Sequence, residues 1–231
     1  MTELQAAQRI AEKDLAFLKG VDSPTIANAI EPFKVRDRTE GFIGGRVRSL
    51  FPEMSPMVGS ALTVTMTNTP GPIAGRENWW RMYEALSAIP SPSILVVRDV
   101  SGAPSRCALA GEVMATLAMR LGAVGMVTDG GVRDVHEVRQ LGFAYFSRYV
   151  VVAHGNFDIV DIGAPVTLDG QEVKTGDILH GDANGIVIVP RDVLDGLPDA
   201  VQEVRNRERA TMDFILSPEY TLAAARKRAG Y

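Results

Sequence analysis

The stretch LAGEVMATLAMRLGAVGMVTDGGVRD, residues 109–134, constrains the fold of this chain more than any other. Val113, Leu117 and Leu121 recur at four-residue spacing, which predicts a helix with one apolar face that ends at Gly122. The apolar residues 123–128 then predict a short buried strand, and Asp129-Gly130-Gly131 predict a turn after it. A helix that leads into a buried strand is typical of α/β folds, in which ligands bind beyond the carboxyl ends of strands.

The residue types in this stretch suit the binding of a small acid and a metal ion. Gly111 and Glu112 begin the helix, where unpaired backbone N–H groups and the positive end of the dipole attract an anion. Arg133 offers a planar set of donors that fits a carboxylate. Asp134 offers a hard oxygen ligand of the kind that Mg²⁺ or Mn²⁺ prefers. Together these groups would suit a 2-oxo acid.

A purely structural interpretation of the same residues stays open. The sequence Asp134-Val135-His136-Glu137 fits a capping box, with Asp134 as the N-cap of the next helix and Glu137 at its third position. Arg133 would then be a solvated side chain, and Glu112 a charge stabilised by the helix dipole. The two interpretations are compatible, because a carboxylate has one oxygen for each role.

The remaining patterns predict one α/β domain with a mixed sheet, since helices and strands alternate early and strands dominate later. The expected helices are 4–18, a short helix with Ser23 as N-cap and Pro24 after it, 77–89, 134–140, a long helix from Pro198 and a last helix from Ser217-Pro218. The expected strands are 61–67, 93–99, 149–154, 157–162, 165–168 and short strands within 178–189. The single domain would span residues 1–231, with a core at about 23–190 and a C-terminal helical extension at about 191–231.

Composition excludes several classes of function. A net charge of −4 and a pI near 5.5 argue against a nucleic-acid-binding surface, and no apolar run approaches the ~20 residues of a membrane-spanning helix. Cys107, the single cysteine, is expected to be a small buried apolar side chain, and its isolation fits a reducing cytoplasm. The aromatic residues Trp79 and Trp80 are expected to form a packing or subunit face.

Several segments in combination resemble the RraA-like family: Gly111-Glu112, the run GAVGMVTDGGVRD, Phe146-Ser147-Arg148 and the run GDANGIVIVP at 181–190. That family includes class II pyruvate aldolases that act on 4-hydroxy-4-methyl-2-oxoglutarate and 4-carboxy-4-hydroxy-2-oxoadipate. The resemblance covers roughly residues 23–209. It implies a swivelling β/β/α-type fold, as a single domain with a mixed central sheet and flanking N- and C-terminal helices. It also implies a homo-oligomer, a trimer or hexamer, with sites between subunits.

The resemblance implies a metal-dependent lyase that cleaves a 4-hydroxy-2-oxo acid to pyruvate and a second oxo acid, with oxaloacetate decarboxylation as a side activity. The metal would be Mg²⁺ or Mn²⁺, and the substrate a small 2-oxo acid. The implied site residues are Arg133, Glu112 and Glu208 for catalysis, Gly111, Arg133 and the backbone N–H groups of Val113 and Met114 for substrate binding, and Asp134 for the metal. Glu112 would bind metal-coordinated water, and Glu208 would reach the site of a neighbouring subunit.

Two further functions stay open. One is a protein-binding regulator of ribonuclease activity without catalysis, as in the RNase E inhibitor branch of the family. The other is a lyase for a different, sugar-derived oxo acid. If the substrate differs, we expect the sequence to diverge from the family at Trp79-Trp80 and at Asn28. The family often has an acidic residue at the position of Asn28, and whether Glu31 takes its place stays open.

Overall fold

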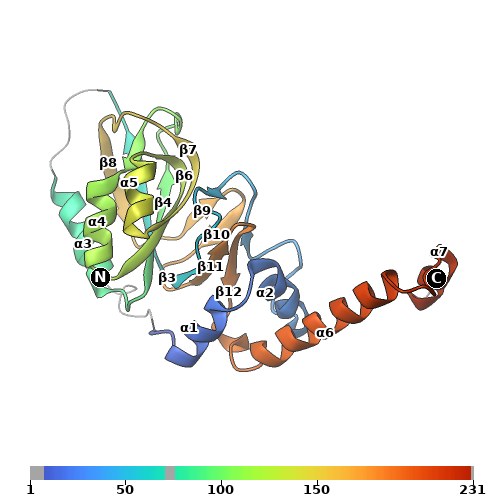
Figure 1. Ribbon diagram of the computed structural model, residues 1–231. Coiled ribbons are helices and arrows are strands. Elements are labelled where there is room, and N and C mark those ends of the chain that lie inside the picture. The colour runs from blue at the N-terminus through green and yellow to red at the C-terminus, as the bar shows by residue number, and fades with distance from the viewer. Residues whose placement is uncertain (1–7, 71–75, 230–231) are drawn as a thin grey trace.

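The computed structural model describes residues 8–70 and 76–229, and Figure 1 shows their arrangement. The helices are α1 (Glu12–Lys19), α2 (Ser23–Ile30), α3 (Glu77–Ala88), α4 (Glu112–Arg120), α5 (Val135–Leu141), α6 (Leu197–Ile215) and α7 (Leu222–Arg228), with 3₁₀ turns at Glu31–Phe33 and Arg191–Val193. The strands are β1 (Phe42–Ile43), β2 (Arg48–Ser49), β3 (Met57–Asn68), β4 (Ser93–Asp99), β5 (Ala108–Ala110), β6 (Ala123–Val132), β7 (Ala144–Val150), β8 (Phe157–Ile162), β9 (Val166–Leu168), β10 (Gln171–Val173), β11 (Ile178–Asp182) and β12 (Gly185–Val189).

Ten of the described strands form a mixed sheet in the order β1-β12-β11-β3-β4-β6-β7-β2, with β5 beside β6 and β8 beside β3. Strands β9 and β10 pair antiparallel as a separate two-stranded hairpin. Strands β3, β4, β6 and β7 run parallel to one another, whereas β11 and β12 join antiparallel. The apolar run of β4 is buried on both faces, because helices cover one face and the β9–β10 hairpin covers the other. The mixed α/β fold expected from the sequence is confirmed.

Three apolar clusters hold these layers together. One lies between the sheet and α3, α4 and α5, and includes Met82, Met114 and Val138 from the three helices. The second lies on the opposite face, below the β9–β10 hairpin. The third packs α1, α2 and α6 against the β11–β12 end of the sheet. The helix-covered face and the hairpin-covered face therefore have separate cores, and each has its own cavity at the carboxyl ends of the parallel strands.

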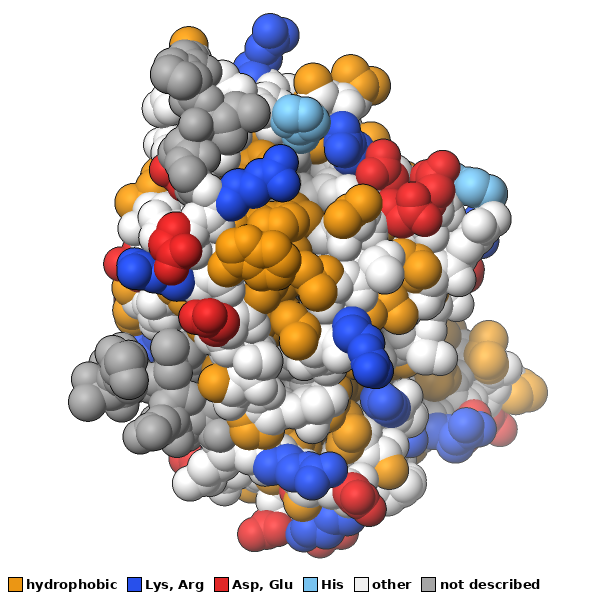
Figure 2. All heavy atoms as spheres, turned by 90° about the vertical axis from the view of Figure 1, so that its left-hand side faces the viewer, with side chains coloured by type: hydrophobic (Ala, Val, Ile, Leu, Met, Phe, Trp, Pro, Cys, Tyr) orange, Lys and Arg blue, Asp and Glu red, His pale blue; other side chains and the backbone are white. Residues whose placement is uncertain are grey.

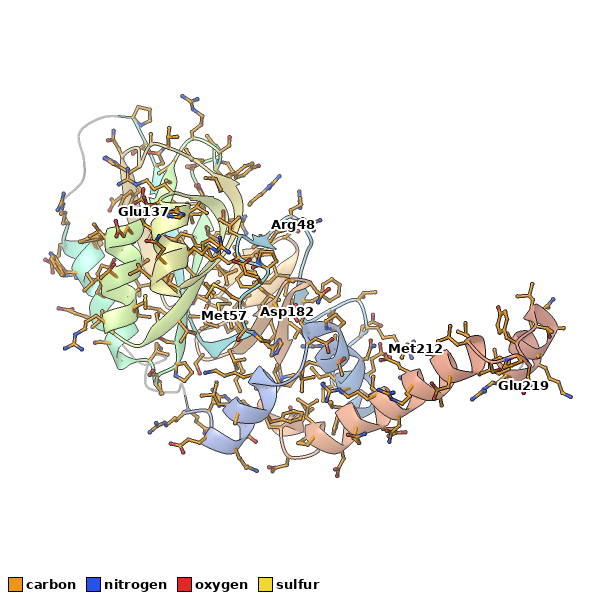
Figure 3. All side chains as sticks on the ribbon, in the orientation of Figure 1. Arg48, Met57, Glu137, Asp182, Met212 and Glu219 are labelled. Carbon is orange, nitrogen blue, oxygen red and sulfur yellow. The ribbon has the colours of Figure 1, made fainter. Side chains whose placement is uncertain are left out.

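The start of α6 is anchored, and its far end extends away from the sheet with α7 beyond it (Figure 1). Leu197, Val201 and Val204 in its first half are buried. Met212, labelled in Figure 3 together with Glu219 on the same projecting arm, is 54% exposed. A helix from Pro198 onward was expected and is confirmed.

The predicted turn at residues 129–131 is wrong, because strand β6 continues to Val132. Glycine serves here for close approach between strands: a Cβ on Gly131 would lie 2.6 Å from the backbone oxygen of Cys107. Strand β5 pairs with β6 at this point through Ala108 and Gly131, and Tyr149 of β7 pairs with Gly131 from the other side. The close approach of β5 and β7, which are distant in sequence, therefore explains the glycine at position 131.

Other boundaries also differ from the expected ones. The strand predicted at 149–154 is β7, which lies earlier, at Ala144–Val150. No helix starts at Ser217-Pro218; the last helix begins after Thr221, whose side chain accepts from the Ala224 N–H at 3.0 Å. The N-cap of α2 is Asp22 instead of Ser23. Residues 4–7 of the expected first helix lie outside the described residues, and Glu12–Lys19 is helical.

Asp182, the acidic residue in the turn between β11 and β12, connects these two strands to α2. Its carboxylate accepts hydrogen bonds from the backbone N–H of Ser23 at 2.7 Å and from the Ser23 hydroxyl at 2.6 Å. It also accepts from the Asn184 N–H at 2.8 Å, which is the turn role expected from the sequence. Figure 3 shows Asp182 where the central sheet meets α2.

His180 links β11 to the loop between α1 and α2. Its buried Nε2–H donates to the backbone oxygens of Leu18 at 3.0 Å and Val21 at 2.9 Å, because a carbonyl oxygen can only accept. Burial lowers the pKa of the imidazole below its ordinary value, although the two carbonyl oxygens oppose this shift. His180 therefore binds a proton less readily in the folded protein than in the unfolded chain.

We expect this histidine to destabilise the fold in acid. As the pH falls through the unfolded pKa of about 6.5, the unfolded chain binds a proton that the folded chain does not, so the free energy of unfolding falls. Urea unfolding of wild type and His180→Gln at about pH 7.5 and about pH 5.5 measures the difference. Glutamine keeps an N–H donor and does not titrate, so the variant should lose less stability between the two values. An equal loss in both proteins would contradict the assignment.

Candidate functional site

The central feature of the site is the junction where β6 ends beside the start of α4. Strand β5 pairs with the end of β6, with Ala110 opposite Val132, and the next backbone N–H, of Arg133, donates to the Ala110 oxygen at 2.9 Å. Gly111 follows directly and is the N-cap of α4. Two chain segments 22 residues apart in sequence thus meet, and Arg133 and Asp134 lie against the first turn of α4.

Asp134 caps α4 from outside that helix. Its Oδ2 accepts a hydrogen bond from the Glu112 N–H at 2.9 Å and lies 3.6 Å from Arg133 Nε. The backbone of Asp134 is left-handed, with φ 54° and ψ 41°, and its side chain makes no capping hydrogen bond to its own helix α5. Asp134 is the N-cap residue of α5 as expected, but the predicted capping box does not form, because the carboxylate turns toward the dipole of α4 instead.

The first turn of α4 leaves donors for a further anion. Asp134 occupies the N–H of Glu112, whereas the N–H groups of Val113 and Met114 have no acceptor among residues 8–70 and 76–229. These are the two backbone donors assigned to substrate binding on the family resemblance. Free N–H groups at the positive end of a helix form a natural site for a carboxylate.

Gly111 is required by the close packing of this corner. A Cβ at this position would lie 2.3 Å from Asp134 Oδ2 and 3.0 Å from Arg133 Nε. Any side chain here would displace the carboxylate or the guanidinium. Gly111 therefore keeps the two charged groups next to the helix start.

A cavity of about 270 Å³ opens over this corner. Five of the predicted site residues line it together: Gly111, Val113, Met114, Arg133 and Asp134. The side chains of Arg133 and Asp134 are 37% and 35% exposed, so both are half-buried and reach solvent through the cavity. This volume suits a small ligand more than a drug-sized one.

The other two predicted residues do not line the cavity. Glu112 is exposed at the start of α4, adjacent in sequence to lining residues on both sides. Glu208 lies on α6, where its Oε1 accepts from the Asn28 side chain at 3.4 Å. Asn28 and Glu208 are therefore paired with each other within the chain, and neither is brought to Asp134.

The opposite wall of the cavity comes from residues that sequence reasoning did not assign to a site. They are Arg76 and Trp79 at the start of α3, His154 to Asn156 in the loop before β8, and Phe157 to Ile159 in β8 itself. Strand β8 pairs antiparallel with β3, and this pairing brings the wall into place. No local sequence pattern predicts such long-range strand pairing. Trp79 was expected to belong to a packing or subunit face, and Trp79-Trp80 to be a place of divergence in substrate. Trp79 does pack against the core, and it also lines the cavity.

The interior behind the cavity is strongly desolvated. Tyr145 is fully buried, its hydroxyl has no hydrogen-bond partner among the described residues, and burial raises its pKa, with the Asp134 charge adding to the shift. Cys107 is also fully buried, and its thiol donates to the His154 oxygen at 2.9 Å. Burial raises the pKa of this thiol to about 11, so it is neutral near pH 7 and is a poor nucleophile. Its expected role as a small buried side chain is confirmed.

The donor set around Asp134 fits a hard divalent cation that keeps most of its own water. Among the described residues no group of three or more His, Cys, Asp or Glu side chains converges, so these residues offer no cage built from protein ligands alone. Mg²⁺ is commonly held by one or two carboxylates together with water and substrate. Asp134 lines the cavity, its Oδ2 is engaged by the Glu112 N–H, and no described residue donates to its other oxygen, which is consistent with that requirement.

Fold and site together define a class: a mixed α/β protein with an anion-binding helix start, an arginine and a carboxylate at the end of a parallel strand. A family model described as RraA-like, Aldolase/RraA, matches residues 14–188. The chain belongs to this family, which confirms the resemblance.

The comparisons with individual proteins agree. A relative from Halalkalibacterium halodurans, named "Putative 4-hydroxy-4-methyl-2-oxoglutarate aldolase", is 32% identical over 141 residues, which are 59% of this chain and 64% of the relative. The match thus spans less than two thirds of that relative. An uncharacterised protein from Pseudomonas syringae has a TM-score of 0.71 at 23% identity over 97% of both chains. Streptomyces coelicolor RraAS2, titled an unusual member of the RNase ES inhibitor RraA protein family, has a TM-score of 0.67 at 20% identity, covering 88% of this chain and 97% of that one. These two structures support the fold. No helix in the described part of the chain is long and apolar enough to cross a bilayer.

Proposed function

We propose that this protein is a divalent-metal-dependent lyase that cleaves a 4-hydroxy-2-oxo acid to pyruvate and a second oxo acid. The observation that carries the proposal is the shared corner of one cavity: the Arg133 guanidinium, the Asp134 carboxylate and two free N–H groups of α4. Relatives named as putative aldolases support the same reaction class.

The chain's own groups match the pyruvoyl half of such a substrate. The N–H groups of Val113 and Met114 would bind its carboxylate at the helix start. The 4-hydroxyl group would lose its proton to bound water beside Glu112 as the bond between C3 and C4 breaks and its electron pair enters the enolate. Arg133 would donate to the 2-oxo oxygen, where the negative charge grows, and return of a proton to C3 would give pyruvate. Bound at Asp134, Mg²⁺ or Mn²⁺ would supply Lewis-acid polarisation of the same carbonyl group. Oxaloacetate loses CO₂ through the same pyruvate enolate, so its decarboxylation is an expected side activity.

The second half of the substrate would lie against Arg76, Trp79 and β8, which form the opposite wall. This wall is the part of the cavity where substrate choice is set. A sugar-derived oxo acid is the alternative substrate. If it is the substrate, substitutions in this wall should alter the choice of substrate.

A neighbouring subunit would complete the site in the proposed oligomer. Val113, which lines the cavity, is 74% exposed within a single chain. Figure 2 shows hydrophobic side chains gathered at the centre of the face on the α3 side, with basic and acidic side chains around them. An exposed apolar patch with a charged border is typical of a protein interface. Glu112 and the Glu208 of a second copy are the acids proposed to act there on bound water.

Pyruvate release tests the proposal. The substrates are oxaloacetate and 4-hydroxy-4-methyl-2-oxoglutarate, each with Mg²⁺, with Mn²⁺ and with EDTA. Release from both that stops in EDTA is the expected result. Release from oxaloacetate alone would support the pyruvate site and a different aldol substrate. A folded protein that releases pyruvate from neither would contradict the proposal and favour the second candidate, a non-catalytic regulator like the RNase ES inhibitor family that RraAS2 is said to belong to.

Gly111→Ala is expected to lower kcat/KM for pyruvate release by about a hundredfold, because a displacement near 1 Å at a reacting group has an effect of that order. The new methyl group would overlap Asp134 Oδ2 and press on Arg133 Nε. Gly45→Ala is the matched control, since its Cβ would meet only the Arg48 side chain at an ordinary 3.7 Å. Steady-state assays and thermal unfolding of both variants separate activity from stability. Unchanged kcat/KM in Gly111→Ala would show that the corner tolerates rearrangement.

A further inference from the structure

A second cavity, of about 230 Å³, lies on the hairpin-covered face of the sheet. Arg98, Asp129 and Arg148 come from the carboxyl ends of the parallel strands β4, β6 and β7. They continue the buried row of Val96, Val127 and Phe146, two residues further along each strand, and so point to the same face. Arg46 and Asp169 complete the wall. We call this the arginine cavity, and it shares no lining residue with the cavity at Asp134.

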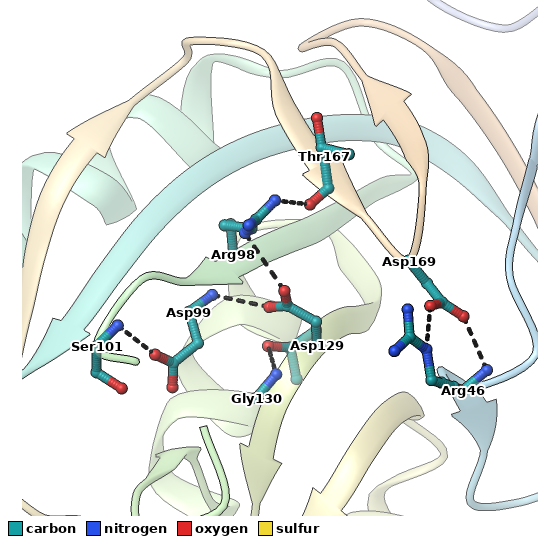
Figure 4. A network of polar contacts seen from close by, with 9 residues as sticks. Arg46, Arg98, Asp99, Ser101, Asp129, Gly130, Thr167 and Asp169 are labelled. Atoms are coloured by element: carbon teal, nitrogen blue, oxygen red, sulfur yellow. Dashed lines mark hydrogen bonds and ion pairs between the residues drawn. The ribbon is translucent and has the colours of Figure 1, made fainter. Parts of the chain in front are cut away.

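Arg98 is held in position from two sides (Figure 4). Its Nε lies 3.4 Å from Asp129 Oδ2, and its Nη1 donates to the backbone oxygen of Thr167 in β9. Asp129 is fixed in turn, because its Oδ1 accepts from the Asp99 N–H at 2.8 Å. The second terminal nitrogen of Arg98 has no acceptor in the described part of the chain.

Arg46 is held by the turn of the β9–β10 hairpin. Asp169 accepts from the Arg46 backbone N–H at 2.9 Å and from its side-chain Nε (Figure 4). The hydrogen bond from the Arg46 backbone, with the guanidinium beside it, keeps the pKa of Asp169 below its ordinary value. Both terminal nitrogens of Arg46 have no acceptor within residues 8–70 and 76–229.

Arg148 is the third cation of the cavity, and it forms no ion pair with any described residue. Its guanidinium lies 5.2 Å from the centre of the Tyr149 ring. Three guanidinium groups thus face two carboxylates, which leaves one positive charge without a partner. The resemblance to the family included Phe146-Ser147-Arg148, and the proposed lyase site makes no use of this arginine.

We propose that the arginine cavity binds a small oxyanion, a ligand with a carboxylate or phosphate group. The guanidinium forks match both groups geometrically. Because carboxylates already order Arg46 and Arg98, binding would cost little side-chain entropy. The volume lies below the roughly 300–1,000 Å³ of typical ligand pockets, so the cavity suits a small ligand.

Inorganic phosphate and malonate are the two probes, titrated by calorimetry into the Arg133→Ala variant, which weakens anion binding at the lyase site. Binding to the remaining N–H groups of α4 would not respond to a change at Arg148, so the comparison with Arg148→Gln identifies the arginine cavity. We expect saturable binding that weakens as salt is added. Arg148→Gln in the same background should weaken it about tenfold, as expected for loss of a charge-assisted hydrogen bond. Arg226→Gln on α7 removes the same charge from a remote exposed site and should leave binding unchanged.

The outcomes separate the two ligand chemistries. Saturation by phosphate alone assigns a phosphoryl ligand, saturation by malonate alone assigns a carboxylate, and both assign a general oxyanion site. Absence of saturation with either probe overturns the proposal, as does an equal loss in Arg148→Gln and Arg226→Gln. None of these results depends on pyruvate release, because the two cavities have no residue in common.

Discussion

Asp134→Asn is expected to lower metal-dependent pyruvate release about a thousandfold, because metal-ion stabilisation of charge in the transition state amounts to several kcal/mol. In the wild type the Glu112 N–H lies 2.9 Å from the Asp134 carboxylate. The amide oxygen of asparagine can accept the same hydrogen bond, so the side chain should stay at the start of α4. Asparagine lacks the negative charge that would hold the cation. The change therefore tests the charge of Asp134 separately from its hydrogen bond.

The measurements are kcat/KM with oxaloacetate and Mn²⁺ affinity by calorimetry. Wild type in EDTA should fall to the level of Asp134→Asn, and the variant should bind Mn²⁺ far more weakly. Asp213→Asn, an exposed acid on α6, removes the same charge elsewhere and should behave as wild type. Wild-type activity and Mn²⁺ affinity in Asp134→Asn would show that the metal is held by other groups.

Arg133→Lys is expected to reduce kcat/KM by about 10²–10³-fold, the range measured for loss of one donor to a developing oxyanion. Lysine keeps the positive charge but not the planar fork, so the loss would measure geometry more than charge. The Arg133 backbone bond to Ala110 at 2.9 Å is independent of the side chain, so β5 and β6 should stay paired. If Arg133 contacts both the bound substrate and the enolate, KM should rise while kcat falls.

Arg120→Lys at the opposite end of α4 is the matched control, since this exposed arginine lies in the last turn of the same helix. It should retain wild-type kcat and KM. Thermal unfolding of both variants checks that the fold is intact. Full activity in Arg133→Lys would mean that only a positive charge is needed there, and the proposed fork to the 2-oxo oxygen would be wrong.

Much of the fold could be predicted because its elements have local causes. The apolar spacing within residues 113–121 predicts α4, and Gly122 follows its end in the left-handed conformation, with φ 96°. The buried face is that of Met114, Ala115 and Ala118, whereas Val113 is 74% exposed, so the predicted helix is confirmed but its buried face is shifted. The unbroken apolar run of residues 94–97 gives β4, which is buried on both faces. Each pattern lies within one or two helical turns or within one strand. A short stretch of sequence therefore contains the residues that decide whether a helix or a strand forms.

The errors share one origin, which is contact between distant segments. Gly131 looks like a turn residue within its own window, but the pairing of β5 and β7 with β6 makes it a strand residue. Asp134 is the N-cap residue of α5, as its local sequence indicates, but its carboxylate accepts from the start of α4 and not from α5. In both cases a partner on another element competes with the local pattern and wins.

The sequence by itself determined the helix start at Gly111, the adjacent charges Arg133 and Asp134, and the strand that precedes them. Only the tertiary structure decided that these groups meet in one cavity, that Arg76, Trp79 and β8 form its opposite wall, and that Arg46, Arg98 and Arg148 surround a second cavity on the other face. The physical reason is that backbone periodicity is set by neighbours along the chain, whereas a site is set by strand pairing across the sheet.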